Sequence, residues 1–283
     1  MAEIETLLLG HSPDPDDAFM FYGLATGRVP SGRWRFEHVL QDIQTLNERA
    51  TRGELHVTAI SMHAYPYVAD RYALTACGSS MGDGYGPMVV ARRSMTVGEL
   101  RGTTIAVPGE MTTAFLVLNL LLGRGGFRYT VVRFDEILER VADGKADAGL
   151  IIHEGQLTYS GHKLVKIVDL GEWWRDQTGL PLPLGGNVIR RDLGPEAMKE
   201  VTGILRRGIE FSLAHRAEAV KHALQFARGM ATELADRFIG MYVNPWTLDY
   251  GDVGRRAVRE LLNRGAAAGL VPPVGEIDVV TGD

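Results

Sequence analysis

The chain has 283 residues, of which 45% are hydrophobic and 23% charged, and its formal net charge is -5. This composition is typical of a globular protein with one large core or two modest ones, and the single cysteine, Cys77, excludes an intrachain disulfide framework and paired thiolate ligands. The sequence has no block of Lys and Arg that would indicate a nucleic-acid surface, and no apolar run approaches the roughly 20 residues that span a bilayer. The N-terminus lacks the features of a secretory signal. We therefore expect a cytoplasmic protein without nucleic-acid or membrane partners.

Strands and helices alternate along the first 190 residues. Short apolar runs predict strands at residues 6–10, 36–40, 58–61, 88–92, 104–107, 129–134, 148–152, 165–169 and 187–191. Helical periodicity and capping residues predict helices at residues 18–25, 43–53, 65–69, 112–122 and 134–142, and a mostly helical segment from 195 to 269.

This alternation predicts an α/β fold with mainly parallel sheets. Residues 93–185 are interpreted as a small lobe inserted into a large discontinuous lobe of residues 1–92 and 186–283, with crossovers near 88–94 and 183–190. Ligands of open parallel sheets bind beyond the carboxyl ends of the strands. Small or polar residues stand at four such ends, so we expect one cleft between two lobes, lined by Ser12–Asp17, Ser61, Gly109–Thr113 and His153–Glu154.

The segment PGEMTT (108–113) follows a strand and opens a helix. Free N–H groups at a helix start favour a carboxylate, and the hydroxyls of Thr112 and Thr113 add donors. The alternative is that one threonine only caps its own helix, and the pattern leaves both readings open. The G-x-x-x-x-G-K spacing of a P-loop is absent.

The segment SPDPDD, residues 12–17, could supply an acid or hold a divalent cation through oxygen ligands. Two prolines stiffen this loop, and Asp16 or Asp17 could cap the helix that follows, as an aspartate before a helix usually does. We therefore favour a capping role and predict no metal site.

The segment LIIHE ends an apolar strand at His153. Leu157 occupies the position of the second histidine of H-E-x-x-H, and strand geometry would turn His153 and Glu154 to opposite faces, so the pair is unsuited to one metal. A neutral imidazole at a strand end suits a general base. The pattern alone favours a hydrogen-bonded, partly buried histidine.

Taken together, several segments resemble the 1,4-dihydroxy-6-naphthoate synthase family of the futalosine route to menaquinone. They occur in the family's order from about residue 6 to 270, and LIIHE and TGLPLPLG are the most specific; the others are HSPDPDDAFMFYGL, VLQDIQTLN, PGEMTTAF and YVN–W–LD. The sister family, chorismate dehydratase, shares the fold and a TGLP-like segment.

The resemblance implies a two-lobed, type II periplasmic-binding-protein-like fold used as a cytoplasmic enzyme. It implies a carbon–carbon lyase that converts cyclic dehypoxanthinylfutalosine to 1,4-dihydroxy-6-naphthoate and dihydroxyacetone without a cofactor. His153 matches the family's proposed proton acceptor. Residues matching its substrate-binding positions are Ala59, Ile60, Ser61, Thr112, Thr113, Asp42 and Asn47, and we add Ser12 from the first strand end.

Three positions depart from the family pattern. The family usually has SPCPND where this chain has SPDPDD, so Asp14 replaces a small neutral residue and Asp16 an asparagine; Ala59 stands where lysine is frequent. These changes make the cleft more negative toward a small anionic substrate. Two other functions therefore stay open: a small-anion solute-binding protein without catalysis, and a chorismate dehydratase-like enzyme. The oligomeric state is not predicted.

Overall fold

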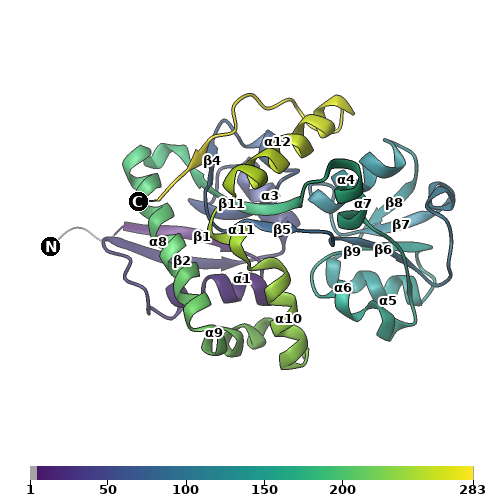
Figure 1. The fold of residues 1–283 in the computed structure, drawn as a ribbon, viewed down its shortest axis with the longest axis horizontal. Coiled ribbons are helices and arrows are strands. Elements are labelled where there is room, and N and C mark those ends of the chain that lie inside the picture. Colours follow the sequence, from purple (N-terminus) through teal and green to yellow (C-terminus); the bar gives the residue numbers. More distant parts are fainter. Residues whose placement is uncertain (1–4, 283) are drawn as a thin grey trace.

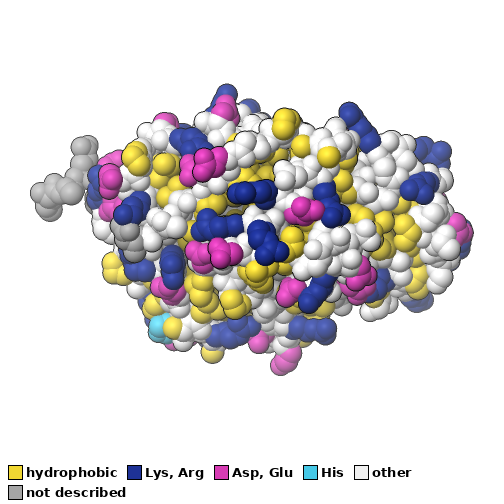
Figure 2. Space-filling view, turned by 45° about the horizontal axis from the view of Figure 1, so that its top comes forward, with side chains coloured by type: hydrophobic (Ala, Val, Ile, Leu, Met, Phe, Trp, Pro, Cys, Tyr) yellow, Lys and Arg dark blue, Asp and Glu magenta, His cyan; other side chains and the backbone are white. Residues whose placement is uncertain are grey.

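The computed structural model describes residues 5–282, which form two α/β lobes side by side (Figure 1). Each lobe is built on one sheet, and both ends of the described chain lie in the first lobe. On the face shown in Figure 2, Lys and Arg side chains lie among Asp and Glu side chains rather than in one block.

The first sheet has seven strands among the described residues, in the order β12-β4-β11-β3-β1-β2, with β5 paired to β11. The ladders β1–β2, β1–β3 and β12–β4 are parallel, whereas β11 runs antiparallel to β3, β4 and β5. The strands are β1 (Glu5–His11), β2 (Trp34–Leu40), β3 (Val57–Ser61), β4 (Tyr72–Thr75), β5 (Ser80–Gly82), β11 (Leu182–Arg190) and β12 (Val279–Val280).

The second sheet has five strands in the order β10-β6-β9-β7-β8. Here β7 pairs in parallel with β8 and β9, and β6 pairs antiparallel with β9 and β10. Both sheets thus combine a parallel part with an antiparallel crossover strand, β11 in one and β6 in the other. The strands are β6 (Met88–Ala91), β7 (Thr104–Val107), β8 (Arg128–Val131), β9 (Ala148–Ile151) and β10 (Val165–Asp169).

Helices cover both sheets, and capping residues of the sequence mark several of their ends. Asp42, Thr112 and Asp169 cap α3, α4 and α7 by accepting backbone N–H groups, and Gly179 ends α7 in the left-handed conformation. The α-helices are α1 (Pro15–Met20), α2 (Tyr22–Ala25), α3 (Ile43–Thr51), α4 (Thr113–Leu122), α5 (Ile137–Ala142), α6 (Gly155–Thr158), α7 (Leu170–Thr178), α8 (Pro195–Ala214), α9 (Arg216–Ala223), α10 (Thr232–Tyr242), α11 (Pro245–Leu248) and α12 (Gly251–Ala267). Short 3-10 turns are η1 (Tyr65–Tyr67), η2 (Val97–Gly102), η3 (Phe134–Glu136), η4 (Tyr159–His162), η5 (Arg191–Leu193) and η6 (Leu224–Phe226).

All nine predicted strands are present, with shifted ends, but some expectations about the elements were wrong. The helix expected over residues 18–25 starts earlier and is broken at Phe21, whose ring packs against His11 at 4.6 Å between centroids. The helix expected over residues 65–69 is only the turn η1. Strands β4, β5 and β12 were not predicted.

The lobe boundaries 1–92, 93–185 and 186–283 stay a prediction. Two strands, β6 and β11, pair in a different sheet from the one that these boundaries would give to some or all of their residues. Strand β6, which that division leaves in the large lobe, pairs only within the second sheet, and β11 already enters the first sheet at Leu182. Each crossover therefore begins several residues before the position expected from sequence.

One apolar core runs through both lobes. It contains Tyr72 and Leu74 of the first lobe, Ile105 and Leu116 of the second, and Leu261 of α12. Burial of this shared core brings the carboxyl ends of strands from both lobes to the same region.

Candidate active site

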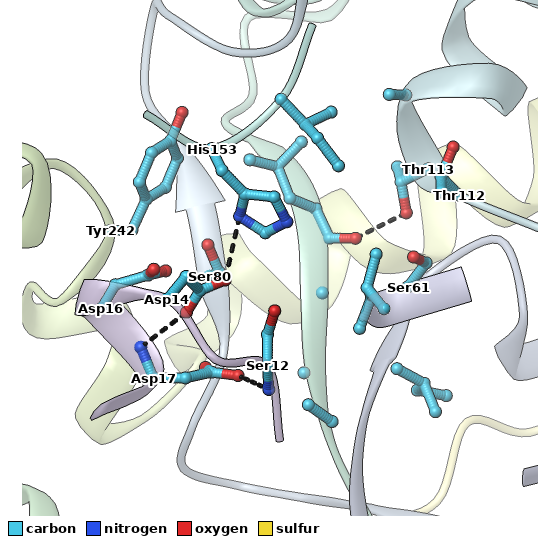
Figure 3. Close-up of a pocket in the computed structure, with 18 of the residues that line it drawn as sticks. Ser12, Asp14, Asp16, Asp17, Ser61, Ser80, Thr112, Thr113, His153 and Tyr242 are labelled. Atoms are coloured by element: carbon cyan, nitrogen blue, oxygen red, sulfur yellow. Dashed lines mark hydrogen bonds and ion pairs between the residues drawn. The ribbon is translucent and has the colours of Figure 1, made fainter. Parts of the chain in front are cut away.

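A cavity lies between the two lobes, at the carboxyl ends of β1, β3, β7 and β9 (Figure 3). Its volume is about 720 Å³ when the open space at its mouth is included. None of the lining residues is Lys or Arg. Most of the lining residues come from these four strand ends and from β11, and the others from α1, α3, α6, α10 and the region of β5 and β6. The lining residues are Ser12, Asp14, Asp16, Asp17, Met20, Ile43, Ala59, Ile60, Ser61, Gly78, Ser80, Pro87, Thr112, Thr113, Ala114, Ile152, His153, Gln156, Leu184, Gly185, Gly186 and Tyr242.

The SPDPDD loop is folded by its own aspartates. Asp14 caps α1 by accepting the N–H of Asp17 at 3.2 Å, and Pro15 occupies the first turn, where its missing N–H costs nothing. The Asp17 carboxylate in turn accepts the N–H of Ser12 at 2.7 Å. The loop does cap a helix, but the expected cap residue was wrong: Asp16 and Asp17 lie inside the first turn of α1, and Asp14 is the cap. All three carboxyl groups are buried.

Burial, and then the negative charge of Asp14, raise the pKa of Asp16 well above its usual range. The same two causes, in the same order, raise the pKa of Asp17. The loop therefore favours protonated carboxyl groups at Asp16 and Asp17, which lowers the negative charge that the three aspartates would otherwise place beside the cavity.

His153 stands directly after β9 in the left-handed conformation, with φ 52°. A non-glycine residue there is strained, and such strain is frequent at functional sites. The imidazole Nδ1 lies 3.1 Å from Oδ2 of Asp14, and Phe134 packs edge-on against the ring at 4.9 Å between centroids. Figure 3 shows the other ring nitrogen turned away from Asp14 toward the cavity.

Three buried polar atoms at the cavity wall have no partner among the described residues: Ser12 Oγ, Asp16 Oδ1 and His153 Nε2. Buried polar atoms are nearly always paired in folded proteins. Their convergence indicates a site for a polar ligand.

Both threonines of the PGEMTT segment line the cavity, but their hydroxyls are already engaged. Thr112 donates to the carbonyl of Gly109 at 2.8 Å and caps α4, and Thr113 donates to the carbonyl of Leu184 at 2.5 Å. The capping alternative is therefore confirmed for Thr112. The N–H groups of Thr113 and Ala114, at the start of α4, have no acceptor among the described residues, so this helix start keeps the donors that a carboxylate needs.

The triplet Ala59, Ile60 and Ser61 lies at the end of β3 and lines the cavity as expected. Asn47 is fully buried behind it. It donates to Ser61 Oγ at 3.1 Å and accepts the N–H of Ser61 at 2.8 Å, and it also donates to the carbonyl of Met111 across the cleft. Asp42 caps α3 through Thr45. Neither Asn47 nor Asp42 lines the cavity; Asn47 holds a lining residue in place.

Sequence reasoning missed two facing residues of the wall. Tyr242 donates its buried hydroxyl to Gln156 Oε1 at 2.6 Å. The residues are 86 positions apart, so no local pattern could have paired them.

Several contacts close the cleft from both sides. Arg228 donates to Glu154 at 2.7 Å and to the carbonyl of Pro13 at 3.1 Å, and its guanidinium lies over the Phe134 ring. Together with the Asp14–His153 and Tyr242–Gln156 contacts, they join the first lobe to the segment after β9.

Ligand atoms of Asp14, Asp16 and His153 lie within 4.8 Å of one another, so these side chains could also surround a cation. The 3.1 Å contact between Asp14 and His153 already pairs two of these three side chains with each other, with no cation needed.

Within residues 5–282, no helix combines the length and the apolar character that a membrane crossing requires.

Comparison with known proteins places this cavity in context. A family model described as menaquinone biosynthesis matches residues 7–267. A Thermus thermophilus protein named 1,4-dihydroxy-6-naphthoate synthase is 44% identical over 270 residues, covering 95% of this chain and 97% of the relative. A Streptomyces coelicolor protein of the same name is 41% identical, covering 96% of each chain.

Solved structures show the same fold. A crystal structure of an Archaeoglobus fulgidus protein superposes with a TM-score of 0.90 at 43% identity, covering 94% of this chain and 98% of the other. The alkanesulfonate-binding protein of Xanthomonas axonopodis, at 15% identity, covers 96% of each chain with a TM-score of 0.69. The expected periplasmic-binding-protein-like α/β fold is thus confirmed.

Proposed function

The chain belongs to the menaquinone biosynthesis family, and we propose that it acts as a 1,4-dihydroxy-6-naphthoate synthase. The substrate would be cyclic dehypoxanthinylfutalosine, and the products 1,4-dihydroxy-6-naphthoate and dihydroxyacetone. We further propose a carbon–carbon lyase reaction in the cytoplasm, as the resemblance to this family implies.

One structural observation supports the proposed chemistry in addition to the family membership. The cavity holds an imidazole whose Nε2 has no partner among the described residues, on the wall opposite the free N–H groups at the start of α4. A base and an anion-binding group facing each other across an enclosed space suit a substrate that carries both an acidic proton and a carboxylate.

In the proposed mechanism, the start of α4 binds the substrate carboxylate through the N–H groups of Thr113 and Ala114. His153 Nε2 accepts a substrate proton, after which a ring of the substrate opens and a carbon–carbon bond breaks. The imidazolium then returns the proton to the departing dihydroxyacetone fragment. Formation of the aromatic naphthoate makes the reaction favourable. The cross-lobe contacts of Arg228 and Tyr242 exclude water while the base acts.

The absence of Lys and Arg from the cavity wall bears on substrate charge. An anion can be bound there only by N–H and hydroxyl donors, so the neutral state favoured at Asp16 and Asp17 reduces repulsion of the carboxylate.

The decisive experiment incubates the purified protein with cyclic dehypoxanthinylfutalosine and, separately, with chorismate. Chromatography with mass detection should show the naphthoate and dihydroxyacetone from the first substrate, and no dehydration of the second. Conversion of chorismate instead would assign the sister activity. Tight binding without turnover of either compound would favour the solute-binding function that the distant structural neighbours carry in their names.

A further inference from the structure

We propose that Asp14 is the positioning residue for His153: its carboxylate accepts the Nδ1–H and thereby leaves Nε2 as the proton acceptor. This inference rests on the proposed function, because it concerns the same base. It adds a residue from the opposite lobe, which the sequence marked only as a departure from the family pattern.

The geometry of the pair supports this role. Asp14 Oδ2 lies 3.1 Å from Nδ1, and the Asp14 side chain is only 1% exposed. An ionised carboxylate has no hydrogen to give, so Nδ1 must carry the hydrogen and Nε2 the lone pair. Phe134 packs against the ring, which restricts rotation that would exchange the two nitrogens.

The loop around Asp14 supplies a donor for the second carboxylate oxygen. The N–H of Asp17 donates to Oδ1 at 3.2 Å, while Oδ2 faces the imidazole. Burial, and then the charge of Asp14, raise the pKa of Asp16 and of Asp17, which favours their protonated forms. Both oxygens of Asp14 thus have a hydrogen-bond donor.

The charge has a direct use in the reaction. When Nε2 takes the substrate proton, the ring becomes an imidazolium, and the adjacent carboxylate stabilises this positive charge in a site shielded from water. The proton moves from substrate to Nε2, and the ring keeps its hydrogen on Nδ1.

The pair also joins the two lobes. Asp14 follows β1 of the first sheet and His153 follows β9 of the second, so the base has its partner only while the lobes are together. Arg228 bridges the same two loops through Pro13 and Glu154. Closure therefore completes the base as well as enclosing the substrate.

The test compares Asp14→Asn with wild type and with Asp192→Asn, a matched change at an exposed ion pair far from the cavity. The amide can donate to Nδ1 and so favours the tautomer with hydrogen on Nε2. We expect kcat for Asp14→Asn to fall between about 10- and 10⁴-fold with little change in naphthoate affinity. Asp192→Asn should match wild type.

The double variant shows whether Asp14 acts through the histidine. In a His153→Asn background, Asp14→Asn should cause no further loss of kcat, because the group it positions is gone. A further loss equal to that in wild type would overturn the proposal. So would a normal kcat for Asp14→Asn when His153→Asn is inactive. If His153→Asn is itself active, the histidine base fails, and the positioning role fails with it.

A measurement that needs no turnover tests the positioning role of Asp14 separately from the proposed synthase activity. Nitrogen-15 NMR, with the His153 signals assigned by their loss in His153→Asn, should show hydrogen on Nδ1 in wild type and on Nε2 in Asp14→Asn. The same tautomer in both proteins would contradict the inference even if the synthase activity is confirmed. A stoichiometric divalent cation, measured by elemental analysis and lost in Asp14→Asn together with activity, would replace it by a metal site.

Discussion

Arg228 and Glu154 form an ion pair across the cleft, with 2.7 Å between Nη1 and Oε1. The pair is partly buried, at 33% and 13% side-chain exposure, and Arg228 holds the left-handed conformation with φ 48°. A strained residue that links the two lobes beside the proposed base is suited to hold the closed state.

Arg228→Gln should therefore weaken closure. We expect naphthoate affinity to fall roughly 3- to 30-fold, mainly through faster release, because one charge-assisted contact across the cleft is lost. Stopped-flow fluorescence would measure the release rate, and small-angle scattering with bound product would show a larger radius. Arg133→Gln, at an exposed pair with Asp135, is the control and should behave like wild type.

The start of α4 is tested by two substitutions at one position. Thr113→Ala and Thr113→Pro both remove the hydroxyl, but only proline removes the N–H, and Thr112 before it has the extended backbone that proline requires. If this N–H binds the carboxylate, product affinity should be about 10- to 150-fold weaker in Thr113→Pro than in Thr113→Ala. Calorimetric titration measures the difference, and equal affinities would remove this N–H from the site.

His153→Asn keeps a polar side chain that cannot accept a proton near neutral pH. Turnover should fall by roughly 10²–10⁴-fold, while binding of the naphthoate changes little. Near-normal turnover would remove His153 as the base and direct attention to the aspartates of the Ser12–Asp17 loop.

A second histidine pair predicts how stability depends on pH. Burial, and then the neighbouring His38, lower the pKa of His11 to about 3, and His11 Nε2 lies 2.9 Å from His38 Nδ1. Because the unfolded chain binds a proton near the ordinary value of about 6.5 and the folded chain does not, stability is lost as pH falls below that value.

The raised pKa values of Asp16 and Asp17 act in the opposite sense, since their folded forms retain protons. Both proteins contain Asp16 and Asp17, so subtracting the unfolding free energy of His11→Gln from that of wild type removes the contribution of these aspartates. Between pH 7 and 5, wild type should lose about 2 kcal/mol more than the variant in urea unfolding. Parallel pH curves would show that His11 does not titrate on unfolding.

The sequence predicted the strand ends that form the site better than it predicted the contacts between them. Strand ends with small or polar residues were readable, because apolar runs and turns are local signals; they located Ser12, Ser61, Thr112 and His153 at one cavity. The role of Asn47 was not readable, since its contacts with Ser61 and Met111 depend on how the two lobes meet.

The Asp14–His153 contact shows the same limit more sharply. The residues lie 139 positions apart, one per lobe, and each has a complete local explanation, as a helix cap and as the end of a strand. Only the arrangement of both sheets shows that they meet. Strand β6 was placed with the large lobe for a related reason: its pairing partners, β9 and β10, come more than fifty residues later.

The position of β11 also affects the order in which a growing chain can assemble. Strand β11 separates β3 from β4, so the first sheet cannot be completed until the ribosome has released residues up to Arg190, and β12 joins only at the very end. The second sheet needs only residues 88–169, which are synthesised as one uninterrupted segment. The later-starting lobe can thus complete its sheet first during translation, while β3 and β4 wait for β11 to come between them.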